Sequence, residues 1–318
     1  INSINNNDSS YLSSIIDSNA EARAFSSAGS RNSWNFKNLL NYRNTFGKHR
    51  LDVLAGVEAS KNTIKVNNIR GTGFSNSTLK TPQDAAVVES YYNESAKTFL
   101  SILGRVNYDF DGKYLLSVTA RRDGSSVFGR NKRWGLFPAV SLGYNISEEP
   151  FFDGIKETVN YLKLRASYGV SGNAEIGNYA WVSNYAQANY NGASGITLAN
   201  IGDDELGWES ALQTNIGLSM QMFDGKFRLD VDVYEKLTQD LLLPYPVTVL
   251  SGLTQVTTNL GEIKNEGIEA MVGVTLVDKD DFTWDAELTY AWNTNEVIDI
   301  GDNAEGIDIP GFGTTSIY

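Results

Sequence analysis

The sequence predicts an all-β, antiparallel, up-and-down β-barrel that crosses a membrane. Three observations predict it. Apolar and polar residues alternate along about ten segments, short and long connections follow each other, and aromatic residues gather near the short connections. Alternation with a period of two is typical of a strand with one apolar and one polar face. No run of 18 or more apolar residues is present, which excludes a bundle of membrane-spanning helices.

The clearest strand covers residues 99–110, where Leu100, Ile102 and Val106 fall on one face and Arg105 and Asp109 on the other. The predicted strands, in chain order, are 34–46, 51–59, 99–110, 114–123, 136–146, 162–171, 212–222, 227–233, 267–276 and 282–293. Residues 1–32 are expected to form a loop or an incomplete strand.

The connections between these strands predict two different ends. Short turns are expected near 47–49, 111–113, 224–226 and 278–280, two of them marked by Asp-Gly, a strong hairpin signal. A somewhat longer connection covers about 148–160. Long connections rich in Asn, Gly, Ser and Asp are expected at 65–96, 124–133, 173–207 and 242–257.

A soluble β-sandwich or barrel is the alternative to a membrane barrel. Charges on the polar face suit both, but the predicted strands are long enough for the roughly 9–11 residues that a tilted strand needs to cross a bilayer. Aromatic residues near the short turns resemble a girdle at one membrane interface. They are Tyr42, Phe46, Tyr108, Phe110, Tyr114, Tyr144, Tyr161, Phe223, Phe227, Phe282 and Trp284. This placement favours the membrane barrel.

Composition excludes several functions. The chain has 318 residues, a formal charge of −12, no Cys and one His. The acidic balance argues against nucleic-acid binding, and the absence of Cys excludes thiolate metal sites and cysteine nucleophiles. His49 sits in a short turn and is expected to be a polar turn residue. We therefore expect neither an enzyme, a metal site nor a cofactor.

Residues 125–149 read SSVFGRNKRWGLFPAVSLGYNISEE, and further motifs follow at Gly172-Asn173, Leu206-Gly207-Trp208-Glu209 and Asn259-Leu260-Gly261. In this order they resemble the SusC/RagA-like TonB-dependent outer-membrane transporters of the Bacteroidota. Tyr144 stands where that family usually has Trp. The resemblance covers about 33–300, nearly the whole chain.

The resemblance implies a barrel of about 22 strands that is plugged by an N-terminal domain. It also implies import of glycans or peptides, a SusD-like surface lipoprotein as partner, and energy delivered through TonB. Because only about ten strands are predicted and no plug or TonB box is recognised, residues 1–318 are expected to be part of the barrel of a longer polypeptide. The plug domain and the C-terminal part of the barrel are expected to be missing from it.

Two sets of residues are candidates for a role. Aromatic side chains in the connection 173–207 either stack on a sugar or peptide ligand or pack the loop: Tyr179, Trp181, Tyr185 and Tyr190. The family-motif residues Phe128, Gly129, Arg133, Trp134, Phe137 and Pro138 are expected to be structural, with Trp134 near the membrane interface and Pro138 in a local bulge.

Two alternatives to import of glycans or peptides remain open. The first is a structural or surface-display scaffold in a larger outer-membrane complex, and the second is an importer of siderophores or vitamins. The fold is shared among all these importers, so it does not identify the substrate.

Overall fold

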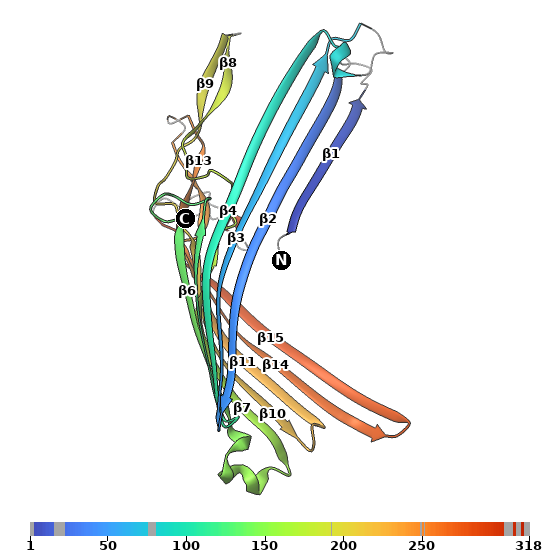
Figure 1. The fold of residues 1–318 in the computed structure, drawn as a ribbon, viewed down its shortest axis with the longest axis vertical. Helices are drawn as coiled ribbons and strands as arrows, with labels where there is room; N and C mark the ends of the chain where they lie inside the picture. Colours follow the sequence, from blue (N-terminus) through green and yellow to red (C-terminus); the bar gives the residue numbers. More distant parts are fainter. Residues whose placement is uncertain are drawn as a thin grey trace. The chain divides into compact units, whose positions relative to one another are not determined.

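The computed structural model describes residues 3–15, 23–75, 81–191, 193–248, 250, 252–301, 308–309 and 313–314. Within these residues the main element is an 11-stranded antiparallel sheet in which strands adjacent along the sheet follow each other in the chain, apart from short hairpins inserted between them (Figure 1). In chain order its strands are β1 (Ser3–Ile15), β2 (Arg23–Phe46), β3 (His49–Thr72), β4 (Val87–Phe110), β5 (Tyr114–Ser125), β6 (Trp134–Asn145), β7 (Val159–Asn173), β10 (Glu209–Met222), β11 (Phe227–Gln239), β14 (Glu262–Lys279) and β15 (Phe282–Asp299).

Smaller elements complete the described part of the chain. Three two-stranded hairpins pair β8 (Asn184–Tyr190) with β9 (Ala193–Asn200), β12 (Leu242–Pro246) with β13 (Gln255–Asn259), and β16 (Asp308–Ile309) with β17 (Gly313–Thr314). Three 3₁₀ turns are η1 (Pro82–Asp84), η2 (Ile146–Glu148) and η3 (Pro150–Ile155). None of the helices among the described residues has the length and apolar character needed to cross a membrane.

The chain divides into two compact units. Unit 1 contains Ile1–Asn38 and Glu58–Leu100, and unit 2 contains Leu39–Val57 and Ser101–Tyr318. In unit 1, β1 pairs with β2 without interruption from Ser3 opposite Asn35 to Ile15 opposite Arg23. A loop or an incomplete strand was expected for residues 1–32. The difference arises because backbone groups form the ladder, so a Ser- and Asn-rich segment pairs without apolar alternation.

Unit 1 also corrects the predicted long connection at 65–96. Strand β3 runs to Thr72 and β4 begins at Val87, so the connection covers only 73–86. Polar pairs join the extended parts of these strands: Lys65 Nζ lies 3.4 Å from Glu94 Oε1, and Ser90 Oγ donates to Asn67 Oδ1 at 3.2 Å. Because polar side chains make these contacts between β3 and β4, the apolar alternation that signals a strand is missing there.

In unit 2 the register places apolar residues opposite apolar residues. One row crosses β5, β6, β7, β10, β11, β14 and β15 through Leu116, Leu142, Ala166, Ile216, Val233, Ile268 and Trp292. The next row crosses the same strands through Tyr114, Tyr144, Leu164, Leu218, Val231, Ala270 and Tyr290. The predicted alternation of these strands is therefore confirmed as one continuous apolar face.

The apolar face of unit 2 is not covered by a second layer. Leu136, Leu142 and Leu288 are exposed on it, and each is more than half accessible. The most deeply buried apolar side chains lie elsewhere, near the long connections: Val127, Phe128, Leu206 and Leu243. A sheet that leaves so broad an apolar surface open requires an apolar environment outside the chain.

The short connections lie together at one end of unit 2, at the lower side of Figure 1. Gly47, Gly112 and Gly225 each have a positive φ, as tight hairpin turns demand. Neighbouring turns are joined by backbone hydrogen bonds, for example from Asp111 N to Lys48 O at 2.8 Å. Rings contact one another from strand to strand just above these turns, through Phe46, His49, Phe110, Tyr114 and Tyr144.

Candidate functional site

The polar face of unit 2 carries a row of small polar side chains. The register aligns Ser117 with Ser141, Ser141 with Ser167, and Ser167 with Asn215. Alternate residues of a strand share a face, so this row lies opposite the apolar rows. Small side chains between longer neighbours leave a trough in the surface of the sheet.

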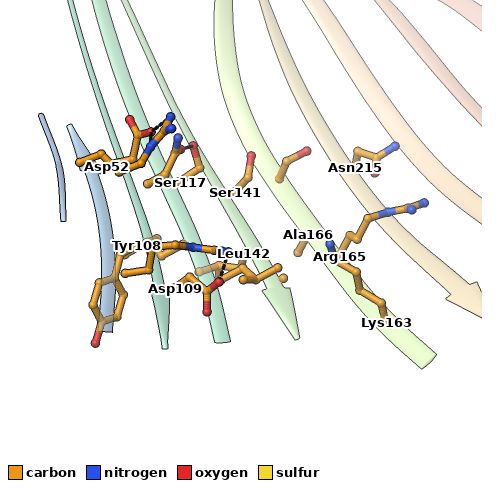
Figure 2. Close-up of a pocket in the computed structure, with 17 residues that line it drawn as sticks. Asp52, Tyr108, Asp109, Ser117, Ser141, Leu142, Lys163, Arg165, Ala166 and Asn215 are labelled. Atoms are coloured by element: carbon orange, nitrogen blue, oxygen red, sulfur yellow. Dashed lines mark hydrogen bonds and ion pairs between the residues drawn. The ribbon is translucent and has the colours of Figure 1, made fainter. Parts of the chain in front are cut away.

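A groove of about 690 Å³ follows this row (Figure 2). Its lining includes four cationic side chains, Arg43, Arg50, Lys163 and Arg165, and two carboxylates, Asp52 and Asp109. Figure 2 shows Lys163 and Arg165 close together at one side of the groove and Asp52 and Asp109 at the other. The groove therefore combines hydroxyl and amide groups with an excess of positive charge.

Most of these charges are paired. Arg43 Nη2 lies 2.7 Å from Asp52 Oδ2, and Arg50 forms an ion pair with Asp109. The side chain of Lys163 makes no hydrogen bond or ion pair with the other described residues, and the second oxygen of Asp52 is buried without a hydrogen-bond partner there. Lys163 is therefore the charged group of the groove that is available to a solute, beside the hydroxyl and amide groups of the polar row, whereas the unpaired Asp52 oxygen is buried.

Arg165 belongs to a network that crosses three strands. From β7 its Nη2 donates to Asp232 Oδ2 of β11 at 2.9 Å, and its Nη1 donates to Ser219 Oγ of β10 at 2.5 Å. Ser219 Oγ in turn donates to Asp230 Oδ1 at 2.5 Å. The guanidinium passes over β10 at Gly217, where an added Cβ would overlap the Asp232 carboxylate and lie 2.8 Å from Arg165 Nη2.

The side chains that line the groove are of the kinds that bind a polar solute. It offers hydroxyl, amide and cationic groups to a hydrated solute. Among the residues that the structure describes, no three His, Asp or Glu side chains are arranged to hold a metal ion. His49 lies at the short-turn end, where its Nδ1 is 2.7 Å from the Tyr108 hydroxyl and its ring contacts Phe46 and Phe110. It is packed among rings, in the turn region where the sequence places it.

The family-motif segment forms a second cluster, at the end of the long connections. Val127, Phe128 and Leu206 are fully buried there. Gly129 N donates to Leu206 O at 2.8 Å, and an added Cβ at Gly129 would overlap the backbone of Asp204. Two segments that are far apart in the sequence, 126–133 and 203–208, are therefore packed backbone to backbone.

Trp208 is the centre of this motif cluster. Its ring centroid lies 4.7 Å from that of Phe128 and 5.2 Å from that of Phe137. Its Nε1 donates to Arg133 O at 3.1 Å. Asn259 closes the cluster, because its side chain accepts from Gly207 N at 2.6 Å and donates to Gly207 O at 3.0 Å.

The structure places Trp134 on the apolar face of β6 and contradicts the bulge expected at Pro138. Trp134 lies on the same face of β6 as Leu136 and Val140, and the Arg122 guanidinium lies 5.0 Å from its ring centroid. The bulge expected at Pro138 is wrong: β5 and β6 keep one register from Tyr114 to Gly124, with Pro138 opposite Ala120. Pairing of β6 with β7 begins at Ala139, so the missing N–H of proline falls where that ladder ends rather than inside a bulge.

The four aromatic residues predicted as ligand contacts have different environments. Trp181 Nε1 donates to Ser126 O at 3.1 Å, and the guanidinium groups of Arg130 and Arg133 lie 5.6 and 5.1 Å from its ring centroid. Tyr179 has a positive φ in the turn that precedes β8. Tyr185 of β8 is 68% exposed, and Tyr190 ends the same strand. Trp181 is thus held by the neighbouring connection between β5 and β6, whereas Tyr185 is open to solvent.

The structure adds two features that the sequence did not predict. Motifs separated by up to about 130 residues converge on Trp208, and the small polar row with Lys163 and Arg165 forms one groove. The serines were visible only as polar positions of separate strands. Their alignment depends on strand register, which alternation within a single strand does not specify.

Comparison with known proteins agrees with this architecture. The model of the family described as TonB dependent receptor-like, beta-barrel matches residues 2–314. The chain is 33% identical over 284 residues to TonB-dependent receptor P39 of Formosa agariphila and 30% identical over 278 residues to TonB-dependent receptor SusC of Bacteroides thetaiotaomicron. These alignments cover 87% and 83% of this chain but 27% of each relative, so the chain spans about a quarter of their length.

Solved structures give the same result. The RagAB peptide transporter matches with a TM-score of 0.86 and 26% identity, covering 96% of this chain and 36% of that chain. The siderophore receptor PiuA from Acinetobacter baumannii matches with a TM-score of 0.51 and 15% identity, covering 88% of this chain and 40% of that chain. The second similarity is one of fold alone.

Proposed function

We propose, because this chain belongs to the family of TonB-dependent receptor-like β-barrels, that it forms part of the wall of a SusC-like importer in the outer membrane of a bacterium of the Bacteroidota. The observation that carries the proposal is the two-faced sheet of unit 2. One face has apolar rows across seven strands, as lipid contact requires, and the other has the polar groove. The family is one of transporters, and no catalytic role is assigned to the chain.

The proposed substrate is a glycan or a peptide. The solved structure that matches with a TM-score of 0.86 is described as a peptide transporter, and a curated relative is SusC. The groove suits either solute, because both carry many hydrogen-bonding groups that serines, Asn215 and Lys163 can satisfy. A siderophore or a vitamin is the alternative substrate class.

The proposed partners act at the two ends of the barrel. A SusD-like lipoprotein covers the end with the long connections, and TonB delivers energy from the inner membrane through another part of the longer polypeptide. The solute binds at the outer end, the plug is displaced by the energised pull, and the polar face provides successive hydrogen bonds along the path. Tyr179, Trp181, Tyr185 and Tyr190 are proposed to lie near the solute on its arrival, with Tyr185 the most accessible of those described.

Deletion of the gene tests the proposal. Growth on one polymer or peptide source is expected to stop, and the full-length gene is expected to restore it. A variant that lacks coupling to TonB should fail to restore growth although it reaches the outer membrane. Unchanged growth on every nutrient, together with loss of other subunits from an outer-membrane complex, would instead support the scaffold function.

A further inference from the structure

The connection between β6 and β7 exposes two large apolar side chains at the short-turn end. It contains η2 and η3, whereas the other short connections of the main sheet are tight turns. Phe151 is 73% exposed and Ile155 is 53% exposed, although Phe152 between them is only 3% exposed. Phe152 fixes the segment to the protein, whereas Phe151 and Ile155 form an exposed apolar surface that a partner can cover.

This connection is fixed to the sheet. Glu149 accepts a hydrogen bond from the Tyr114 hydroxyl at 2.6 Å and lies 3.2 Å from Lys113 Nζ. At its far end, Thr158 O accepts from Phe223 N at 2.9 Å, in the turn between β10 and β11. The exposure of Phe151 and Ile155 is therefore a property of a held segment.

The contacts of Glu149 identify the face on which the segment lies. Tyr114 and Tyr144 are neighbours in an apolar row of unit 2, and their rings stack at 5.2 Å with an interplanar angle of 6°. Both hydroxyls point to the same carboxylate oxygen, with the Tyr144 hydroxyl 3.3 Å from Glu149 Oε1. The segment begins at the edge of the apolar face, directly beyond the last ring of the aromatic row.

We propose that the segment 146–158 is an interfacial anchor, with Phe151 and Ile155 inserted at the headgroup–acyl boundary of the phospholipid leaflet at the short-turn end. The occupant is a lipid surface because the two side chains continue the aromatic border of a face that meets lipid. Asp153, Lys156 and Glu157 supply charged groups that stay in water, as in other interfacial segments. The anchor rests on the proposed membrane barrel.

Site-directed spin labelling tests the anchor. The sequence has no cysteine, so single substitutions Phe151→Cys, Ile155→Cys, Asp153→Cys and Leu142→Cys place one nitroxide each. Any cysteine elsewhere in the full-length protein is replaced by Ser. The protein is reconstituted in vesicles of phosphatidylethanolamine and phosphatidylglycerol, and collision rates with oxygen and with a water-soluble nickel chelate are measured.

The labels at 151 and 155 are expected to resemble the label at 142, with an oxygen-to-nickel ratio several-fold above that of the label at 153. Equal ratios at 151 and 153 would overturn the anchor while leaving the barrel intact. Labels at 151 and 155 that are shielded from both reagents would overturn it in favour of a protein partner. Nickel access at 142 would overturn the membrane barrel itself, and the anchor with it.

Discussion

Two glycines in unit 2, Gly129 and Gly217, lie where a second backbone or a long side chain passes close to the chain. Gly217 leaves room for Arg165 to reach Asp232 across β10, and Gly129 allows the segment 126–133 to meet the backbone of Asp204. At Gly217 the obstacle is the end of flexible side chains, which can move. At Gly129 it is backbone, which cannot move cheaply, so the two positions differ in tolerance.

Gly129→Ala is therefore expected to destabilise the folded protein by about 1–3 kcal/mol, the usual cost of overpacking a tight site. Gly177→Ala is the matched control, because an added Cβ there has no atom within 4 Å. Urea unfolding midpoints in vesicles measure both. Equal midpoints for the two variants would contradict the close packing at Asp204.

Glu149 gives the short-turn end a pH dependence. The Tyr114 hydroxyl, and after it Lys113, holds the pKa of this carboxyl below its ordinary value of 4.5, against the opposing effect of burial. A lowered pKa in the folded state stabilises the fold fully above pH 4.5, and this contribution is lost as pH falls below that value.

Glu149→Gln should remove this dependence. The loss of stability between about pH 5 and pH 3, measured from urea midpoints, is expected to be smaller in the variant than in the unchanged protein. Asp281→Asn, in the exposed turn between β14 and β15, is the control. An identical pH profile for all three proteins would show that the Tyr114–Glu149 contact contributes nothing.

At the level of single residues, the sequence predicts which face or connection a residue lies on better than it predicts which residues that residue contacts. The motif residues Phe128 and Phe137 were expected to be structural, and the structure places both against Trp208. Whether that is their only role stays a prediction. The bulge at Pro138 was wrong because proline can also be accommodated where a ladder ends, and the sequence does not show where β7 begins to pair.

Adjacent positions of β6 test the two faces of the sheet. Val140 belongs to the apolar face and is opposite Val118 and Tyr168, whereas Ser141 belongs to the groove. Val140→Lys is expected to cost about 2–4 kcal/mol in a bilayer, and Ser141→Lys about 1 kcal/mol or less. Folded fractions across a urea series in vesicles measure the difference. A larger loss for Ser141→Lys would reverse the assignment of the faces.

The hairpin of β8 and β9 tests the ligand role of the loop aromatics. Tyr185 is exposed on it, and Thr197 lies on its other face opposite Ala186. Tyr185→Ala is expected to lower solute uptake several-fold without changing the unfolding midpoint, and Thr197→Ala is expected to leave uptake unchanged. Uptake equal to that of the unchanged protein in Tyr185→Ala would remove this tyrosine from the solute path.

At the level of elements, alternation predicts strands only where one face is apolar. Each of the ten predicted strands corresponds to a strand of the main sheet, from β2 to β15. A loop or an incomplete strand was expected where β1 lies, and loops were expected where the hairpins β8–β9 and β12–β13 lie. Their sequences are polar on both faces or rich in proline, so hydrogen bonding with a neighbour, rather than burial, defines them.

At the level of the whole molecule, two aromatic borders limit the apolar face of unit 2. Trp134 with Arg122 marks the long-connection end of β6, and Tyr144 marks its short-turn end. Tyr144 lies ten positions after Trp134 along the strand. At about 3.3 Å per residue and a tilt of about 40°, this spacing corresponds to roughly 25 Å, the height of the apolar band in outer-membrane barrels.

The whole-molecule prediction also concerns the parts beyond this chain. The order of the main sheet begins at β1 and ends at β15, and the described part of these two strands does not pair together. Open strand edges are not tolerated in lipid, so further strands are expected to close the barrel. The number of those strands, the plug and the partner cannot be predicted from residues 1–318, because they depend on other parts of the longer polypeptide.

The intact mass of the protein purified from its own outer membrane, with identification of whatever copurifies, distinguishes part of a large importer from a small complete barrel. We expect a polypeptide severalfold heavier than 35.0 kDa, accompanied by a surface lipoprotein. A polypeptide of 35.0 kDa that folds in the membrane without a partner would contradict it. The chain would then be a small complete barrel, and the proposed import mechanism would not apply.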